Sequence, residues 1–373
     1  HNLIDTSNLI VNDDLLISNL DLNWNFENSK LNSSFKVFED LSRSYSDRYQ
    51  YVLPDFSFSK NIPIPKNYNG KFTFNSYGYN KIYDTNISEA VVINDFLFSS
   101  NQYITTNGFT NNYSIFLKNP TSYAKNSSNF DDDENYDLYG TIKLDSSLPL
   151  QKKMSRYNHF LIPRTSFRYS PNGNNDISSK DILLNYDNVF SLNRIGSSNQ
   201  VEGGDALSLG LEFIRTDLSG SDIIDFKIGN VLKSKENIKL PKKSKLNKTR
   251  SDIFGSLNYN LNDNIKLGYD YSFDRDLKYS NLEGLNLDIS INNILTNFYY
   301  YTTDNDLGKN ETISNKTEIN INELNKFKFN TAKDLIDDFT EYYNLIYSYE
   351  TDCISLNLNY NKSFYKDGNL EPN

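Results

Sequence analysis

The chain has 373 residues, a formal charge of −10 and a hydrophobic content of 37%. The acidic excess excludes a phosphate-backbone partner, and so a nucleic acid, because proteins that bind nucleic acids normally carry a basic face. So few apolar residues could hardly fill a soluble core for this length, whereas 14% aromatic residues and only 9 prolines do not fit a disordered chain. We therefore expect a folded protein with little apolar interior.

Apolar residues alternate with polar ones along most of the chain, which is the period of a β-strand. In chain order, the clearest segments are 207–213, 224–228, 257–273, 285–291 and 354–360. Within the longest of them, Asn262-Asp263-Asn264 interrupts the alternation and predicts the turn of a hairpin. Helical spacing is not sustained comparably, and no run approaches the roughly 18 apolar residues of a spanning helix. The pattern predicts an all-β protein.

Two all-β architectures fit this alternation, a soluble β-sheet protein and a transmembrane barrel. The second face of the predicted strands is rich in Asn, Ser, Lys and Asp, and several segments reach the roughly nine to eleven residues that cross a bilayer at a tilt. A barrel also needs little apolar interior, because its apolar face meets lipid and its lumen is polar. We therefore predict a transmembrane antiparallel β-barrel of the outer-membrane type, with roughly 14–18 strands in this chain.

Long polar interruptions separate the predicted strands, as extracellular loops do in such barrels. The expected loops are 119–136, 171–181, 233–250 and 303–316. The first contains an acidic run at 131–134, which lacks the alternating acids and the glycine of an EF-hand calcium loop. We therefore expect a solvated loop there and no metal site.

Groups that could carry catalysis are scarce. The chain has 2 histidines, His1 and His159, too few for a metal cluster built on histidine. A hydrolase would depend on His159, but no nucleophile motif such as G-x-S-x-G lies beside it. The EGG at 202–204 lacks the lysine and helix pattern of a phosphate-binding loop. We expect no catalytic, cofactor-binding or metal site, no cofactor, and hence no enzyme.

One region resembles the signature of the LptD family, the lipopolysaccharide-assembly proteins of the bacterial outer membrane. Between Asp187 and Phe213, the residues that match its N-R pair, its D-R-x-E-x-G motif and the following strand are Asn193, Arg194, Glu202, Gly203, Gly204 and Gly210. Upstream, RYQYVLPDFSFSKNI resembles the family's L-P-x-x-x-F strand. FLIPRTSFRYSP, which contains Pro163 and Arg164, resembles its P-R-x-x-x-x-Y-x-P strand. Three downstream segments follow the order of the family's C-terminal half.

The match departs from the family pattern where charges are concerned. The family's D-R dipeptide reads Asn199-Gln200, and a later arginine reads Ala206. We therefore expect any charge network built by those residues to be weakened or relocated. The motif's glycines and prolines also have an alternative interpretation as turn or bulge positions.

The resemblance implies a barrel with a periplasmic jelly-roll domain in front, a lipoprotein plug in its lumen and a lateral opening for lipid. Residues 1–373 would be part of one barrel domain, incomplete without the jelly-roll domain and the last strands. The implied location is the outer membrane of a Gram-negative bacterium. The implied partners are lipopolysaccharide, outer-membrane lipids, an LptE-like plug and, through the N-terminal domain, a periplasmic LptA-like bridge.

The function that the resemblance implies is transport without covalent chemistry. Lipopolysaccharide would enter the outer leaflet through the polar lumen and a lateral strand seam. A generic outer-membrane porin or receptor barrel for small solutes is the alternative.

The single cysteine and three prolines are the remaining candidate residues. Cys353, in Y-E-T-D-C, resembles the family's C-terminal cysteine site, which pairs with a cysteine of the N-terminal domain; a free thiol is the alternative. Pro54, Pro63 and Pro65 cannot donate a ladder hydrogen bond, so they would loosen strand pairing near the lateral seam or form an ordinary turn.

Overall fold

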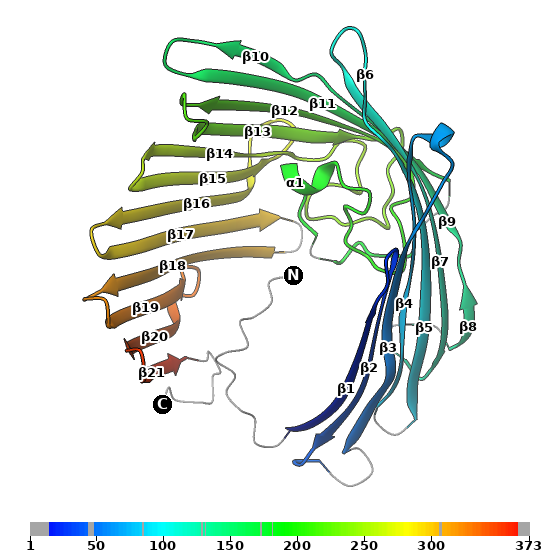
Figure 1. Cartoon of the computed structure of the whole chain (residues 1–373), viewed down its shortest axis with the longest axis horizontal. Helices are drawn as coiled ribbons and strands as arrows, with labels where there is room; N and C mark the ends of the chain where they lie inside the picture. Colours follow the sequence, from blue (N-terminus) through cyan, green and yellow to red (C-terminus); the bar gives the residue numbers. More distant parts are fainter. Residues whose placement is uncertain are drawn as a thin grey trace.

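The structure, a computed structural model, describes residues 15–43, 48–83, 86–127, 130, 132–171, 174–180, 182–305 and 308–364. These residues form one antiparallel sheet, which curves into a horseshoe with the strands following one another along the chain (Figure 1). None of the helices in these ranges is long and apolar enough to span a membrane.

The sheet has 21 strands in the described residues. Three of them, β6, β8 and β10, have only two to four residues, and the other 18 are longer. The strands are β1 (Leu15–Asn25), β2 (Ser29–Asp40), β3 (Tyr49–Ile62), β4 (Gly70–Tyr83), β5 (Ile87–Ser100), β6 (Tyr103–Ile104), β7 (Thr110–Lys125), β8 (Asp133–Tyr136), β9 (Tyr139–Ser147), β10 (Leu150–Lys153), β11 (Asn158–Ser170), β12 (Gly204–Thr216), β13 (Asp222–Leu232), β14 (Ile253–Asn262), β15 (Ile265–Phe273), β16 (Ser280–Ile291), β17 (Ile294–Asn305), β18 (Gly308–Asn320), β19 (Asn325–Asp334), β20 (Phe339–Glu350) and β21 (Ser355–Ser363). The two short helices are η2 (Lys66–Tyr68) and α1 (Tyr186–Val189).

The strands have the inverse of a soluble protein's burial pattern. In β7, Ile115 and Leu117 are 44% and 45% exposed, while Lys118 is only 2% exposed. In β11, Phe167 and Tyr169 are exposed on one face, while Arg168 is buried on the other. Because the apolar face is the exposed one, the sheet is built to meet lipid on its convex side and to enclose polar groups on its concave side.

The predicted hairpin and the predicted alternating strands are confirmed. The alternating segment 257–273 forms β14 and β15, and the interruption predicted as a turn falls between them at 263–264. The segments 207–213, 224–228 and 285–291 lie in β12, β13 and β16. The period of two was informative because each of these strands has one face toward lipid and one toward polar groups.

Two of the expected loops are wrong in part or in full. Residues 303–305 belong to β17 and residues 308–316 to β18, while the first and last parts of 119–136 belong to β7 and β8. On β18, Thr312 and Ser314 alternate with the exposed Ile313 and so lie on the concave face. Polarity marks a loop poorly in this protein, because residues facing a lumen are polar too.

The connections at the two ends of the sheet differ in length. The two long connections, 171–203 and 233–252, lie at one end of the sheet, and they contain the expected loops 171–181 and 233–250. Short connections such as 263–264, 292–293 and 351–354 lie at the other end. Barrels of this type have long extracellular loops and short periplasmic turns. We therefore assign the end that carries 171–203 and 233–252 to the cell exterior.

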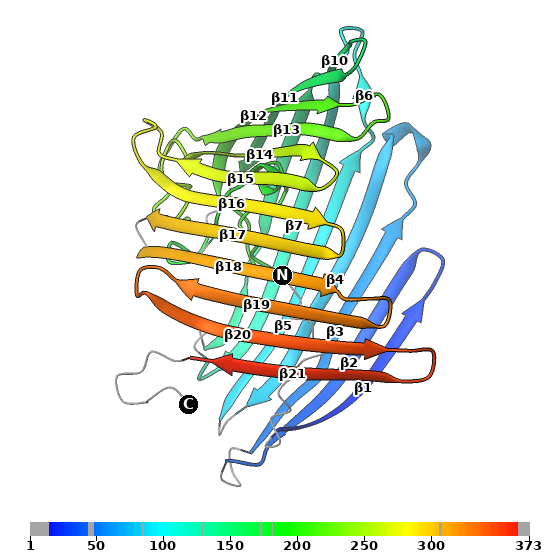
Figure 2. The same ribbon diagram turned by 90° about the vertical axis from the view of Figure 1, so that its left-hand side faces the viewer.

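The curved sheet has two free edges within the described residues. Among the strand pairings, β1 pairs with β2 and β21 pairs with β20, and these outermost strands bound the open side of the horseshoe (Figures 1 and 2). Free edges present unpaired amide and carbonyl groups, which hydrocarbon cannot satisfy. In a bilayer, both edges therefore require a partner strand.

Candidate functional site

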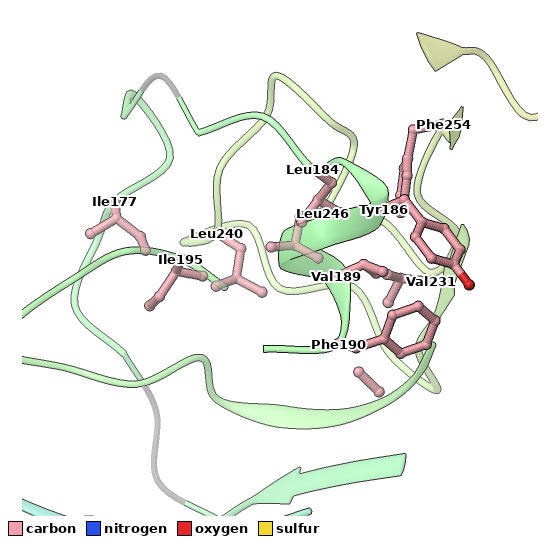
Figure 3. Packing of buried hydrophobic residues seen from close by; sticks show 11 residues of the cluster. Ile177, Leu184, Tyr186, Val189, Phe190, Ile195, Val231, Leu240, Leu246 and Phe254 are labelled. Carbon is pink, nitrogen blue, oxygen red and sulfur yellow. The ribbon is translucent and has the colours of Figure 1, made fainter. Parts of the chain in front are cut away.

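The two long connections fold back onto the concave face of the sheet instead of extending into solvent (Figure 1). We call residues 174–180, 182–203 and 233–252 the inner loops. They supply most of the main apolar core, which packs on Val231 and Phe254 of the wall formed by β12, β13 and β14 (Figure 3). Ala206 of β12 belongs to the same core. The loop residues of this core are Ile177, Leu184, Tyr186, Val189, Phe190, Ile195, Leu240 and Leu246. The protein's main apolar core is thus inside the horseshoe.

Glycines on the wall make room for this packing. A Cβ atom on Gly210 would lie 2.6 Å from Cζ of Phe190 and 2.9 Å from an edge atom of Tyr186. Gly229, the cross-strand partner of Gly210, would place a Cβ 3.0 Å from Phe254. At these distances a side chain would collide with the rings, so the absence of a side chain at both glycines lets the aromatic rings pack directly against the strand backbone. The guanidinium of Arg164 stacks on Phe190 at 4.4 Å and holds that ring from the side.

Beside this core, Glu202 is surrounded by three cations. Its Oε1 accepts from Nη2 of Arg194 at 2.7 Å and from Nζ of Lys233 at 3.1 Å, and its Oε2 accepts from Nε of Arg194 at 2.6 Å. Nη1 of Arg168, on β11, lies 3.3 Å from Oε2. We call these four residues the ion cluster. It joins both inner loops to the wall.

The ion cluster is excluded from solvent, since the four side chains are between 0% and 4% exposed. Burial alone raises the pKa of Glu202, but the guanidinium groups of Arg194 and Arg168 outweigh it and hold that pKa far below its usual range. Burial lowers the pKa of Lys233, and the carboxylate of Glu202 opposes this effect. One carboxylate thus serves as the shared ion partner of three basic groups in a medium where an unpaired charge is costly. Ser208 assists by accepting from Nη1 of Arg194 at 2.8 Å.

A second anchor joins the inner loop to the opposite wall. Nζ of Lys118 donates to Asp95 at 2.7 Å, to the hydroxyl of Tyr77 at 2.9 Å and to the main-chain carbonyl of Ser198 at 2.7 Å. Tyr77 also donates to that carbonyl at 2.9 Å. Val201 packs beside this anchor on β7 and β9. The inner loop therefore bridges the concave space from the β11–β14 side to the β4–β9 side.

The residues of the resemblance gather in this region. Nδ2 of Asn193 donates to the carbonyl of Ser197 at 2.6 Å and closes the turn after α1. The amide of Gly203 donates to Asn174 at 3.3 Å, and Gly204 begins β12 with a φ of +90°. Together with Arg194, Glu202, Gly210 and Arg164, they position one loop and its ion cluster.

The positions that depart from the family pattern make neutral contacts. Oδ1 of Asn199 accepts from the hydroxyl of Ser197, and Oε1 of Gln200 accepts from the amide of Asn175 at 2.8 Å. Ala206 packs in the apolar core. The charges of the region lie instead on Glu202 and its three cations.

Sequence reasoning missed Arg168, Lys233 and Lys118. Arg168 and Lys118 occupy the concave-face positions of alternating strands, so a basic residue in that register was the available signal. No sequence pattern around Lys233 predicts its role, because its partner Glu202 lies 31 positions earlier in the sequence.

The other predicted residues lie outside this site. Pro163 pairs with Leu211 in the sheet, Pro54 lies in β3, and Pro63 and Pro65 lie in the connection to β4. Cys353 is exposed in the connection between β20 and β21.

The histidine and the acidic run that sequence analysis considered lie apart from the inner loops. The ring of His159 packs 5.7 Å from that of Phe213. In the acidic run, Asp131 lies outside the described residues and Asp133 begins β8. Within the described ranges, no group of three His, Cys, Asp or Glu side chains could hold a metal ion.

A curved antiparallel sheet with an apolar outer face and polar, loop-filled concave side defines an outer-membrane β-barrel protein. The chain belongs to the LptD family: the family model described as "LPS transport system D" matches residues 2–334. This family is one of transport proteins, and its place is the outer membrane of Gram-negative bacteria. No curated protein sequence matches the chain.

Solved outer-membrane receptors are similar to the chain at low identity. The siderophore receptor PirA from Acinetobacter baumannii has 7% identity and a TM-score of 0.44, with 94% of this chain and 65% of that chain covered. The ferric enterobactin receptor PfeA from Pseudomonas aeruginosa has 7% identity and a TM-score of 0.46, with 92% and 65% covered. The chain thus spans slightly less than two thirds of the length of these receptors.

Proposed function

We propose that the protein inserts lipopolysaccharide into the outer leaflet through a polar lumen and a lateral strand seam. Membership of the LptD family carries this proposal. The polar concave face supports it, because a sugar chain needs hydrogen-bonding walls, whereas acyl chains must leave sideways into lipid. The function requires no covalent chemistry.

The seam would lie on the side of the sheet that carries β1, β2 and β3, near the three prolines. Pro54 gives partial support for a weakened region nearby. The β2–β3 ladder shifts register between Ser34 and Lys36, and the β3–β4 ladder shifts between Val52 and Asp55, on either side of Pro54. Pro63 and Pro65 lie in the connection between β3 and β4, which fits the alternative that they form an ordinary turn. We retain Pro54, Pro63 and Pro65 as proposed seam residues.

The partners belong to the same proposal. Lipopolysaccharide is the cargo, an LptE-like lipoprotein would occupy the lumen beside the inner loops, and an LptA-like bridge would deliver cargo through a periplasmic jelly-roll domain. Cys353 lies at the short-connection end of the sheet, which we assign to the periplasm, and it would bond a cysteine of that domain. A Cys353→Ser change should then abolish the oxidised, faster-migrating form of the full-length protein on a non-reducing gel. An unchanged pattern would contradict the disulfide.

The decisive experiment depletes the full-length protein in its host and follows newly made lipopolysaccharide to the cell surface. Under the proposed function, surface lipopolysaccharide falls and precursor accumulates inside the cell. Normal delivery, together with a loss of small-solute uptake, would instead identify a porin or receptor barrel.

A further inference from the structure

The convex, lipid-facing side carries a groove that neither the inner loops nor the seam explains. It has a volume of about 490 Å³ and lies over β12, β13 and the start of β14. Its apolar lining comes from Leu209, Leu211, Ile228, Leu232 and Ile253, with Asn230 among them and Arg250 and Arg275 also in the lining. The groove is at the end of the sheet that we assign to the cell exterior.

A local irregularity in the sheet creates this groove. The β13–β14 ladder ends at the pair Gly229 and Phe254, and pairing resumes at Leu232 and Arg250. Two residues on one side therefore face three on the other, which is a β-bulge that spreads the strands. Gly210 and Gly229 contribute only backbone to the lining, since their side-chain positions face the inner loops.

The basic residues lie where a lipid headgroup would be. Arg250 pairs directly with Leu232, and directly paired residues project to the same face, so its side chain is on the lipid side. Within the described part of the chain, its guanidinium has no ion pair or hydrogen bond. Arg275 has one loose ion partner, Asp276, at 3.8 Å, and both side chains are more than half exposed.

No neighbouring acid in the described residues forms a salt bridge with Arg250. Asp274 accepts from the amides of Lys278 at 2.6 Å and Tyr279 at 3.0 Å, and these hydrogen bonds orient its carboxylate toward its own turn. Glu236 is paired with Lys248 at 3.3 Å. The groove thus combines an apolar channel with guanidinium groups at its outer end, which matches an acyl chain joined to a phosphate.

We propose that this groove binds one phosphate-bearing lipid of the outer leaflet, with an acyl chain along Leu209, Leu211 and Ile228 and the phosphate on Arg250 and Arg275. The site is a resident lipid site on the outer wall. It is separate from the seam, and it does not depend on the protein exporting lipopolysaccharide.

Native mass spectrometry of the detergent-purified full-length protein tests the proposal. The probes are phosphatidic acid and diacylglycerol with identical acyl chains, so they differ only in the phosphate. The wild-type protein should retain one phosphatidic acid at least about tenfold more tightly than diacylglycerol. The Arg250→Ala/Arg275→Ala double variant should lose this preference, whereas Arg43→Ala, an exposed arginine at the same end of the sheet, should keep it.

A second variant tests the groove without changing its charge. Asn230→Trp fills the channel, and it should weaken retention of both probes by about tenfold. Equal retention of the two probes by the wild-type protein would overturn the proposal, as would unchanged retention in the double variant. Loss of retention in the double variant with full retention in Asn230→Trp would also overturn it, because the groove would then be irrelevant. Heat-modified mobility on gels verifies that each variant is folded.

Discussion

The carboxylate of Glu202 holds three basic side chains in a space closed to solvent. Replacing it with glutamine keeps the shape and removes the charge, which leaves Arg168, Arg194 and Lys233 facing one another. Removing one partner of a buried ion pair typically destabilises a protein by about 3–5 kcal/mol. We expect Glu202→Gln to lower the free energy of unfolding by this order, as measured by urea unfolding in detergent micelles. Glu236→Gln removes an exposed carboxylate from the same loop system and should have little effect. Equal stability of the two variants would contradict the importance of the ion cluster.

Asp252, the last inner-loop residue before β14, makes the stability of the protein depend on pH. Burial raises its pKa from 3.8 to about 6, although Asn281 and Ser272 donate to its carboxylate. Between these two pH values the folded protein holds more protons than the unfolded chain, so stability falls as pH rises through this window and stays lower above it.

Asp252→Asn should remove this dependence. The variant should be more stable than the wild-type protein at pH 8 by about 1–3 kcal/mol, with the difference disappearing near pH 4. Melting temperatures across the pH range measure it. Asp263→Asn, in an exposed turn at the other end of the sheet, is the control. A difference independent of pH would show that Asp252 is not the titrating group.

At the scale of single elements, β3 is the strand whose pairing is least regular beside the proposed seam. Replacing Pro54, Pro63 and Pro65 together by alanine restores three amide donors. If loose pairing there assists lipid release, the triple variant should deliver less lipopolysaccharide to the surface at equal protein abundance. Pulse labelling of surface lipopolysaccharide measures this, and Pro163→Ala in β11 serves as the control. Unchanged delivery would contradict a role of these prolines in the seam.

The strands could be predicted from the sequence because each has two chemically different faces. In segments such as 285–291, apolar and polar residues alternate with a period of two, which predicts a strand. The inner loops have no such signal, since residues like Ile177, Leu240 and Leu246 are irregularly spaced among polar ones and are buried only by the wall. The resemblance located Arg194 and Glu202, but Lys118 and Lys233 join the site through the curvature of the sheet, which a linear pattern does not contain.

At the scale of the whole molecule, the inner loops occupy part of the space that a barrel would leave open. The backbones of Asn237 and Asn247 already meet, with the amide of Asn237 donating to the carbonyl of Asn247 at 2.9 Å. Residues 238–246 can therefore be deleted while Asn237 and Asn247, which are already in contact, are joined. This deletion removes Leu240 and Leu246 from the core and should loosen the other inner loop.

We expect this deletion to increase ion conductance in planar bilayers and to make cells more sensitive to large antibiotics. Removing Ser219 and Gly220 from the turn at the opposite end is the matched control and should change neither property. Unchanged conductance in the 238–246 deletion would show that the inner loops do not restrict passage.

The anchor between Lys118 and Ser198 also sets an order for maturation of the chain. Lys118, Asp95 and Tyr77 can come together as soon as β4, β5 and β7 pair, but the carbonyl that completes them belongs to a residue 80 positions after Lys118. Contacts this distant in sequence form late, because a long loop must close first. Until residue 198 arrives, the ammonium group of Lys118 would lack one of its three hydrogen-bonding partners. Protection of the Lys118–Ser198 contact would therefore distinguish the assembling intermediate from the folded protein.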